Sequence, residues 1–113
     1  MKKILMIANL SSIHTIKWIN YFGEEFNISV VSSSKLLDKS TLNKNIKSHI
    51  IEKFSNKFFN SIYIIYLILF KNLVSKDQDL IHVHYLGWNA LIGFFLKIKF
   101  FKSNYVSTIW GNE

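Results

Sequence analysis

The chain has 113 residues, a length that allows one small domain. Half of the residues are hydrophobic and 16% are aromatic, which excludes a disordered chain. There is no cysteine, so disulfides, thiolate metal sites and cysteine nucleophiles are excluded, and a cytoplasmic location is expected. The net charge is +7, from 14 lysines and seven acidic residues.

A positive charge of this size suits nucleic acid, anionic lipid or phosphorylated ligands, and it can also serve solubility alone. The lysines are scattered, with no long basic run and no nucleic-acid-binding motif. We therefore expect no nucleic-acid partner, and consider an anionic membrane surface the better candidate for a partner of the basic chain. Because arginine is absent, the chain lacks the usual bidentate clamp for a diphosphate.

The first half of the chain alternates between strand and helix patterns. Residues 3–8 are wholly apolar after a charged start, which predicts a buried parallel strand. Residues 9–12 form a turn, and the apolar spacing over 13–26 predicts an amphipathic helix. Strands are predicted at 28–31 and, near a sheet edge, at 46–51.

Residues 58–74 form a predicted helix that is apolar on nearly every side. A transmembrane span needs roughly 20 apolar residues. This segment is shorter and is interrupted by Asn60, Ser61, Lys71 and Asn72. We therefore expect a helix that is buried between the sheet and a partner, or pressed on a bilayer surface.

The second half adds a strand at 79–84, a helix at about 89–99 and a strand at 104–110. The whole order predicts a Rossmann-like α/β fold, with a parallel sheet ordered 3-2-1-4-5 and helices on both faces. Ligands of such sheets bind at the carboxyl ends of the strands, near the point where the strand order reverses. The loops after the first, fourth and fifth strands should therefore share one rim.

The rim residues give the candidate site. His14 could hydrogen-bond a substrate hydroxyl or act as a base, or it could be an exposed histidine at a helix start. Glu113 is the only acid predicted on the rim, and the alternative is a solvated chain end. Trp88 and Trp110 could stack on a sugar ring or pack in a core or interface. Further residues are expected to shape the rim, namely Ser11, Ser12, Gly111 and Asn112.

His82 and His84 lie two apart on one predicted strand, so both project to the same face. A metal site would need a third ligand, such as His14 or Glu113, and two histidines are weak support. We predict no metal, a buried His82 and a ligand-contacting His84. Neither a G-x-G-x-x-G nor a Walker A sequence is present, which argues against a dinucleotide or nucleoside-triphosphate fold.

Three segments carry a resemblance to a known family. They are ILMIAN at 4–9 with HTIKWIN at 14–20, DLIHVH at 79–84 followed by Gly87, and STIWGNE at 107–113. Together they resemble the N-terminal domain of GT-B-fold glycosyltransferases of family 4 (glycosyl transferases group 1). The resemblance implies two Rossmann-like domains facing a cleft, the N-terminal one binding the acceptor and the C-terminal one the nucleotide-sugar donor. It implies no metal and no cofactor, and a place on the cytoplasmic membrane face, where lipid-linked acceptors of polysaccharide synthesis lie.

Two departures from the family shape the expected function. The family commonly has histidine where this chain has Trp110, so a proton-transferring role does not carry over to that position. The donor half is expected in a missing C-terminal domain or a second subunit, so residues 1–113 read as one incomplete domain that is inactive alone. The alternative is a non-catalytic module that binds a membrane or a partner through residues 58–74.

Overall fold

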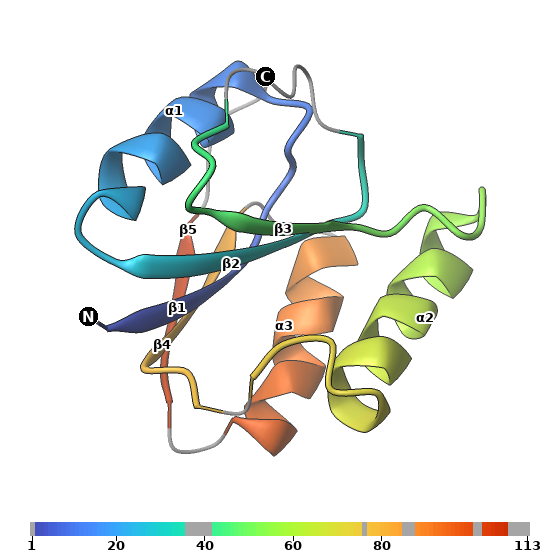
Figure 1. Ribbon diagram of the computed structural model, residues 1–113. Helices are drawn as coiled ribbons and strands as arrows, with labels where there is room; N and C mark the ends of the chain where they lie inside the picture. Colours follow the sequence, from blue (N-terminus) through green and yellow to red (C-terminus); the bar gives the residue numbers. More distant parts are fainter. Residues whose placement is uncertain (1, 36–41, 76, 85–87, 101–102, 109–113) are drawn as a thin grey trace.

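The computed structural model describes residues 2–35, 42–75, 77–84, 88–100 and 103–108. Within them, five strands form one open sheet in the order β3-β2-β1-β4-β5, and every neighbouring pair is parallel (Figure 1). This confirms the predicted α/β class and the predicted strand order. The strands are β1 (Lys3–Ile7), β2 (Asn27–Ser32), β3 (Lys47–Ile50), β4 (Leu80–His84) and β5 (Asn104–Thr108).

Helices cover both faces of the sheet, as the sequence predicts. α1 (Ile13–Gly23) lies on one face, and α2 (Lys57–Phe70) and α3 (Trp88–Lys99) lie together on the other (Figure 1). Successive side chains of a strand point to opposite faces. Ile4 and Met6 therefore join the core under α1, whereas Leu5 and Ile7 join the core under α2 and α3.

The apolar helix predicted at 58–74 ends earlier, at Phe70. Asn72 has a φ of 51°, a left-handed conformation that asparagine tolerates better than most residues. The backbone N–H groups of Lys71 and Leu73 both donate to the carbonyl of Leu67, which closes the last turn. α2 therefore has 14 residues. In the part of the chain that the structure describes, no helix combines the length and apolarity needed to cross a membrane.

The sheet topology positions a site at one edge. β1 pairs with β2 on one side and with β4 on the other, so the chain leaves β1 at the point where the strand order reverses. The helix that follows β1 (α1) and the helix that follows β4 (α3) lie on opposite faces of the sheet (Figure 1), an arrangement that places a crevice at the carboxyl ends of the strands.

Candidate functional site

A cleft of about 260 Å³ opens at this edge of the sheet. Four connections form it: the loops that follow β1, β2 and β3, and the start of α3 after β4. The beginning of α2 closes one wall. The described lining residues are Asn9, Ser33, Ser34, Glu52, Phe54, Ser55, Lys57, Asn60, Ser61, Trp88 and Asn89.

Hydrogen bonds fasten the loops after β1 and β2 to each other. Asn9 Oδ1 accepts from the backbone N–H of Ser11 at 3.1 Å, from the Ser11 hydroxyl at 2.6 Å and from the Ser34 hydroxyl. The buried Ser32 hydroxyl oxygen accepts from the N–H of Leu10 at 3.2 Å and from that of Ser34 at 3.1 Å. These contacts fix the position of the Asn9 side chain at the floor of the cleft.

The wall formed by α2 is held by two asparagines. Asn56 caps the helix, because its side-chain oxygen accepts from the N–H of Phe59 at 3.1 Å. Asn60 is only 4% exposed and uses both ends of its amide. Its Nδ2 donates to the carbonyl of Ile51 at 2.8 Å, and its Oδ1 accepts from the N–H of Phe54 at 3.2 Å. The segment after β3 is thereby tied to the helix.

The start of α3 also lines the cleft. Asn89 Nδ2 donates to the backbone carbonyl of His84 at 2.9 Å, which joins the helix to the end of β4. Trp88 is 42% exposed, and its ring centroid lies 5.8 Å from that of Phe58. An indole that is partly open and held at its edge can cover the apolar face of a sugar ring.

The charges on the cleft balance. Among the described lining residues, Glu52 and Lys57 are the charged ones, and both are exposed. The other polar lining groups are uncharged amides and hydroxyls. Such a cleft suits a neutral ligand that both donates and accepts hydrogen bonds.

The rim residues predicted from sequence lie in different places. Ser11 and His14 are exposed and Ser12 is half-buried, on the loop after β1 and the first turn of α1. These three do not line the cleft, although Ser11 bonds Asn9, which does. Their contact with a substrate stays a prediction. Four other candidates lie outside the described residues, namely Trp110, Gly111, Asn112 and Glu113.

His82 and His84 do project to the same face, with ring centroids 4.4 Å apart. Both are buried on the α1 side, edge-on to Trp18. Burial, reinforced by the neighbouring His82, lowers the pKa of His84 to about 3, and burial also lowers the pKa of His82. His84 thus reaches the cleft wall through its backbone carbonyl, and a substrate contact of its ring stays a prediction.

The described residues do not form a recognisable metal site. Within the described ranges, no three or more His, Asp or Glu side chains gather as a metal would require. The two adjacent imidazoles pack edge-on against the indole of Trp18.

Sequence reasoning missed most of the cleft. It placed the rim on the loops after the first, fourth and fifth strands, whereas the loops after β2 and β3 supply Ser33, Ser34 and Glu52. It treated Asn60 and Ser61 only as interruptions of an apolar helix. A signal was present in those two residues, because adjacent polar side chains at the start of an apolar helix need a polar surface to face.

The comparisons with known proteins agree with this architecture. A family model described as glycosyl transferase 4-like matches residues 3–113, nearly the whole chain. A comparison with curated proteins found no match. The parallel sheet in the order β3-β2-β1-β4-β5 and the cleft at its carboxyl edge fit the resemblance of the three sequence segments. The chain therefore belongs to the glycosyl transferase 4-like family.

Proposed function

We propose that this chain is the acceptor-side domain of a glycosyltransferase. The enzyme would move a sugar from a nucleotide-sugar donor to a hydroxyl of a glycan or a lipid-linked acceptor in cell-surface polysaccharide synthesis. Family membership supports the glycosyltransferase role. The observation that carries the acceptor-side assignment is the charge-balanced, hydroxyl- and amide-lined cleft at the carboxyl edge of the sheet.

The donor's diphosphate is assigned to another part of the enzyme. In the described cleft, Lys57 is the one cation and Glu52 faces the same space, so the negative charge that develops on a departing diphosphate would find little stabilisation. We therefore propose that a second domain or a second subunit binds the nucleotide. The Glu52 carboxylate is then available to accept a hydrogen bond from an acceptor hydroxyl.

An assay of transfer tests this function. Full-length protein is incubated with a panel of nucleotide sugars and a lipid extract of its host cells, and nucleoside diphosphate release and labelled glycolipid are measured. The proposal predicts release that requires both donor and extract. Folded protein that transfers no sugar from any donor of the panel would contradict the proposal.

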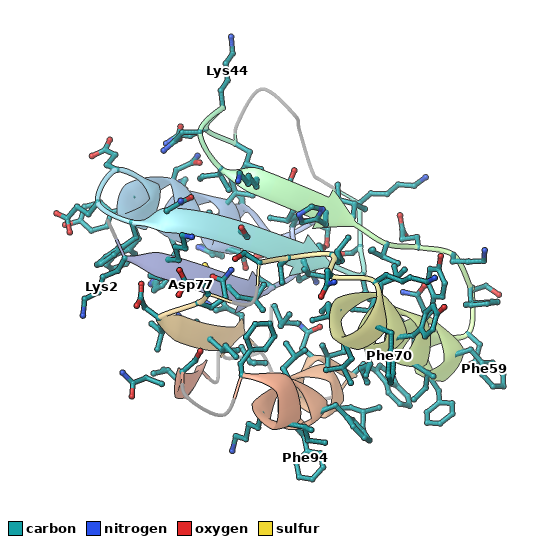
Figure 2. The ribbon with its side chains drawn as sticks, turned by 60° about the horizontal axis from the view of Figure 1, so that its bottom comes forward. Lys2, Lys44, Phe59, Phe70, Asp77 and Phe94 are labelled. Atoms are coloured by element: carbon teal, nitrogen blue, oxygen red, sulfur yellow. The ribbon has the colours of Figure 1, made fainter. Side chains whose placement is uncertain are left out.

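A second function is favoured by a surface of exposed apolar side chains on α2 and α3. Phe59 and Phe94 project away from the sheet, and Phe70 at the end of α2 is 71% exposed (Figure 2). The Phe58–Trp88 ring contact joins the two helices at one end of this surface. We call it the aromatic face, and it comprises Phe58, Phe59, Ile62, Tyr66, Phe70, Phe94 and Ile98.

Charge complementarity suggests that an anionic bilayer covers the aromatic face. The sequences of α2 and α3 contain lysines but no acidic residue. Lys71 lies 5.8 Å from the centre of the Tyr66 ring, and Lys53 lies 5.1 Å from that of Tyr63. Aromatic side chains beside lysines are typical of a surface that rests at the headgroup level of anionic lipids. We therefore propose peripheral attachment to the inner face of the plasma membrane.

Vesicle flotation tests the attachment. Full-length protein is mixed with phosphatidylcholine vesicles, with and without phosphatidylglycerol, at low and high salt. We expect flotation that needs the anionic lipid, weakens at high salt and falls in a Phe59→Ser/Phe94→Ser variant. Tyr21→Ser, which removes an exposed aromatic ring from α1 on the opposite face, is the control. Equal flotation of both variants would contradict a membrane contact at the aromatic face.

The same experiment bears on a purely binding role. A protein that floats with anionic vesicles but transfers no sugar in the assay above would be a membrane-binding module. A protein that transfers sugar but does not float with vesicles would support the transferase function and contradict the proposed membrane attachment.

A further inference from the structure

Two asparagine side chains in the cleft each have one end of the amide engaged. Asn9 Oδ1 takes three donors, from Ser11 and Ser34. Asn89 Nδ2 donates to the carbonyl of His84. Among the described residues, the other ends, Asn9 Nδ2 and Asn89 Oδ1, have no hydrogen-bond partner, and both residues line the cleft.

The orientation of both amides follows from the chemistry of their partners. The backbone N–H of Ser11 can only donate, so the atom of Asn9 that it contacts has to be the oxygen. The backbone carbonyl of His84 can only accept, so the atom of Asn89 that contacts it has to be the nitrogen. Asn9 therefore offers the cleft a fixed donor, and Asn89 offers it a fixed acceptor.

We propose that these two amides read one neutral sugar unit of the acceptor. Asn9 Nδ2 donates to one hydroxyl oxygen, Asn89 Oδ1 accepts from a second hydroxyl, and the Trp88 ring lies along the apolar face of the sugar. This inference rests on the proposed acceptor-side function and names the chemistry that its cleft selects. Since a hydroxyl both donates and accepts, two hydroxyls of one ring can satisfy both amides.

An anionic ligand fits the same groups less well. A phosphate brings mainly acceptors, whereas Asn89 Oδ1 and the Glu52 carboxylate both need donors. Lys57 supplies the one cation of the described lining, and Glu52 offsets it. The sugar unit that binds should therefore carry no phosphate or carboxylate at the hydroxyls that the two asparagines contact.

The test is an NMR titration of full-length protein with three probes and a competitor. The probes are the methyl α-glycosides of glucose, galactose and N-acetylglucosamine, and the competitor is inorganic phosphate. We expect at least one glycoside to shift the side-chain amide signals of Asn9 and Asn89, and phosphate to shift neither. Asn9→Asp keeps an oxygen for Ser11 and Ser34 but replaces the free donor with an acceptor. It should weaken glycoside binding by about tenfold.

Asn9→Asp both removes the Nδ2 donor and adds a negative charge, so a control variant is needed that adds the charge away from the cleft. Asn20 on α1 also accepts a backbone hydrogen bond through Oδ1, from the N–H of Asn43 at 2.8 Å, and lies outside the cleft. Asn20→Asp should leave glycoside affinity unchanged. If Asn9→Asp does not fold, deoxy derivatives of the binding glycoside replace it, and loss of a contacted hydroxyl should again weaken binding to the native protein.

Distinct outcomes overturn this inference and the proposed function. Unchanged affinity in Asn9→Asp and for every deoxy probe, or shifts with phosphate alone, would overturn the reading of a neutral sugar by the two amides. Sugar transfer in the assay above would still stand in that case. Conversely, the protein could bind a glycoside in a way that depends on Asn9 and yet transfer no sugar. That result would support the sugar-binding site and contradict the proposed transferase function.

Discussion

Trp18 of α1 packs edge-on against His84 of β4, with ring centroids 4.9 Å apart and an angle of 76° between the rings. The same indole meets His82 at 4.9 Å and 78°. One residue of α1 thus covers both imidazoles of the strand that borders β1 at the strand-order reversal. The contact removes the histidines from water and links the position of α1 to the end of β4.

Stability should fall with acid because of these two histidines. An unfolded histidine binds a proton near pH 6.5, whereas burial lowers the pKa of folded His84 to about 3. Between these values the unfolded state holds the extra proton, so the free energy of unfolding should drop by about 1.4 kcal/mol per pH unit from His84. His82, whose pKa is also lowered, adds to the slope. Urea unfolding between pH 7 and pH 5 measures the effect.

A matched substitution isolates the cause. His14→Gln, the same substitution at an exposed histidine, is the control variant. His84→Gln should reduce the slope. A slope in His84→Gln that equals the native one would show that other groups produce the acid sensitivity.

Removing the indole should destabilise the protein. Trp18→Ala takes away the contacts with His82, His84 and Phe22, and should lower the free energy of unfolding by about 3 kcal/mol. It should also raise the pKa of His84 toward its ordinary value, because water reaches the ring. Lys17→Ala, an exposed neighbour, should change stability by less than about 0.5 kcal/mol. Equal losses in the two variants would argue against the packing role of Trp18.

Asn60 should matter more than the cap Asn56. Asn60→Ala removes two hydrogen bonds and leaves the Ile51 carbonyl and the Phe54 N–H unpaired, at a cost of about 2–3 kcal/mol. Asn56→Ala removes one capping bond at an exposed helix start and should cost about 1 kcal/mol. Thermal or urea unfolding of the two variants gives the order. A larger loss in Asn56→Ala would contradict the structural role of Asn60.

His14 yields a kinetic prediction. If its imidazole hydrogen-bonds or deprotonates the acceptor, His14→Ala should lower turnover of the full-length transferase by about a hundredfold. The expected stability change is small because the side chain is exposed. Unchanged turnover would remove His14 from the site.

The central position of β1 could be predicted because this strand is buried on both faces, between the two hydrophobic cores. Ile4 and Met6 serve one core and Leu5 and Ile7 the other, so the sequence there is continuously apolar, which is typical of a central parallel strand. The end of α2 could not be predicted from apolarity, because Leu73 and Val74 continue the hydrophobic run. The left-handed Asn72 ends the helix, and Val74 then packs into the core from the following segment.

The cleft was harder to predict than the fold. The switch-point rule leads to the loop that holds Asn9, and that residue does line the cleft. Ser34 is held at the cleft by hydrogen bonds to Ser32 and Asn9, and Asn60 by hydrogen bonds to Ile51 and Phe54. Hydrophobic periodicity predicts neither set of contacts. For His84, the position at a strand end suggests that the ring is accessible to a ligand. In the structure the ring is buried against Trp18, a contact that the sequence does not reveal.

Steady-state kinetics of Trp88→Ala tests most directly whether this cleft binds the acceptor and not the donor. With the full-length transferase and its identified substrates, KM is measured for the acceptor and for the nucleotide sugar in turn. We expect the acceptor KM to rise by about fivefold or more, because a stacking contact is lost, and the donor KM to stay unchanged. A raised donor KM with an unchanged acceptor KM would contradict acceptor binding in this cleft.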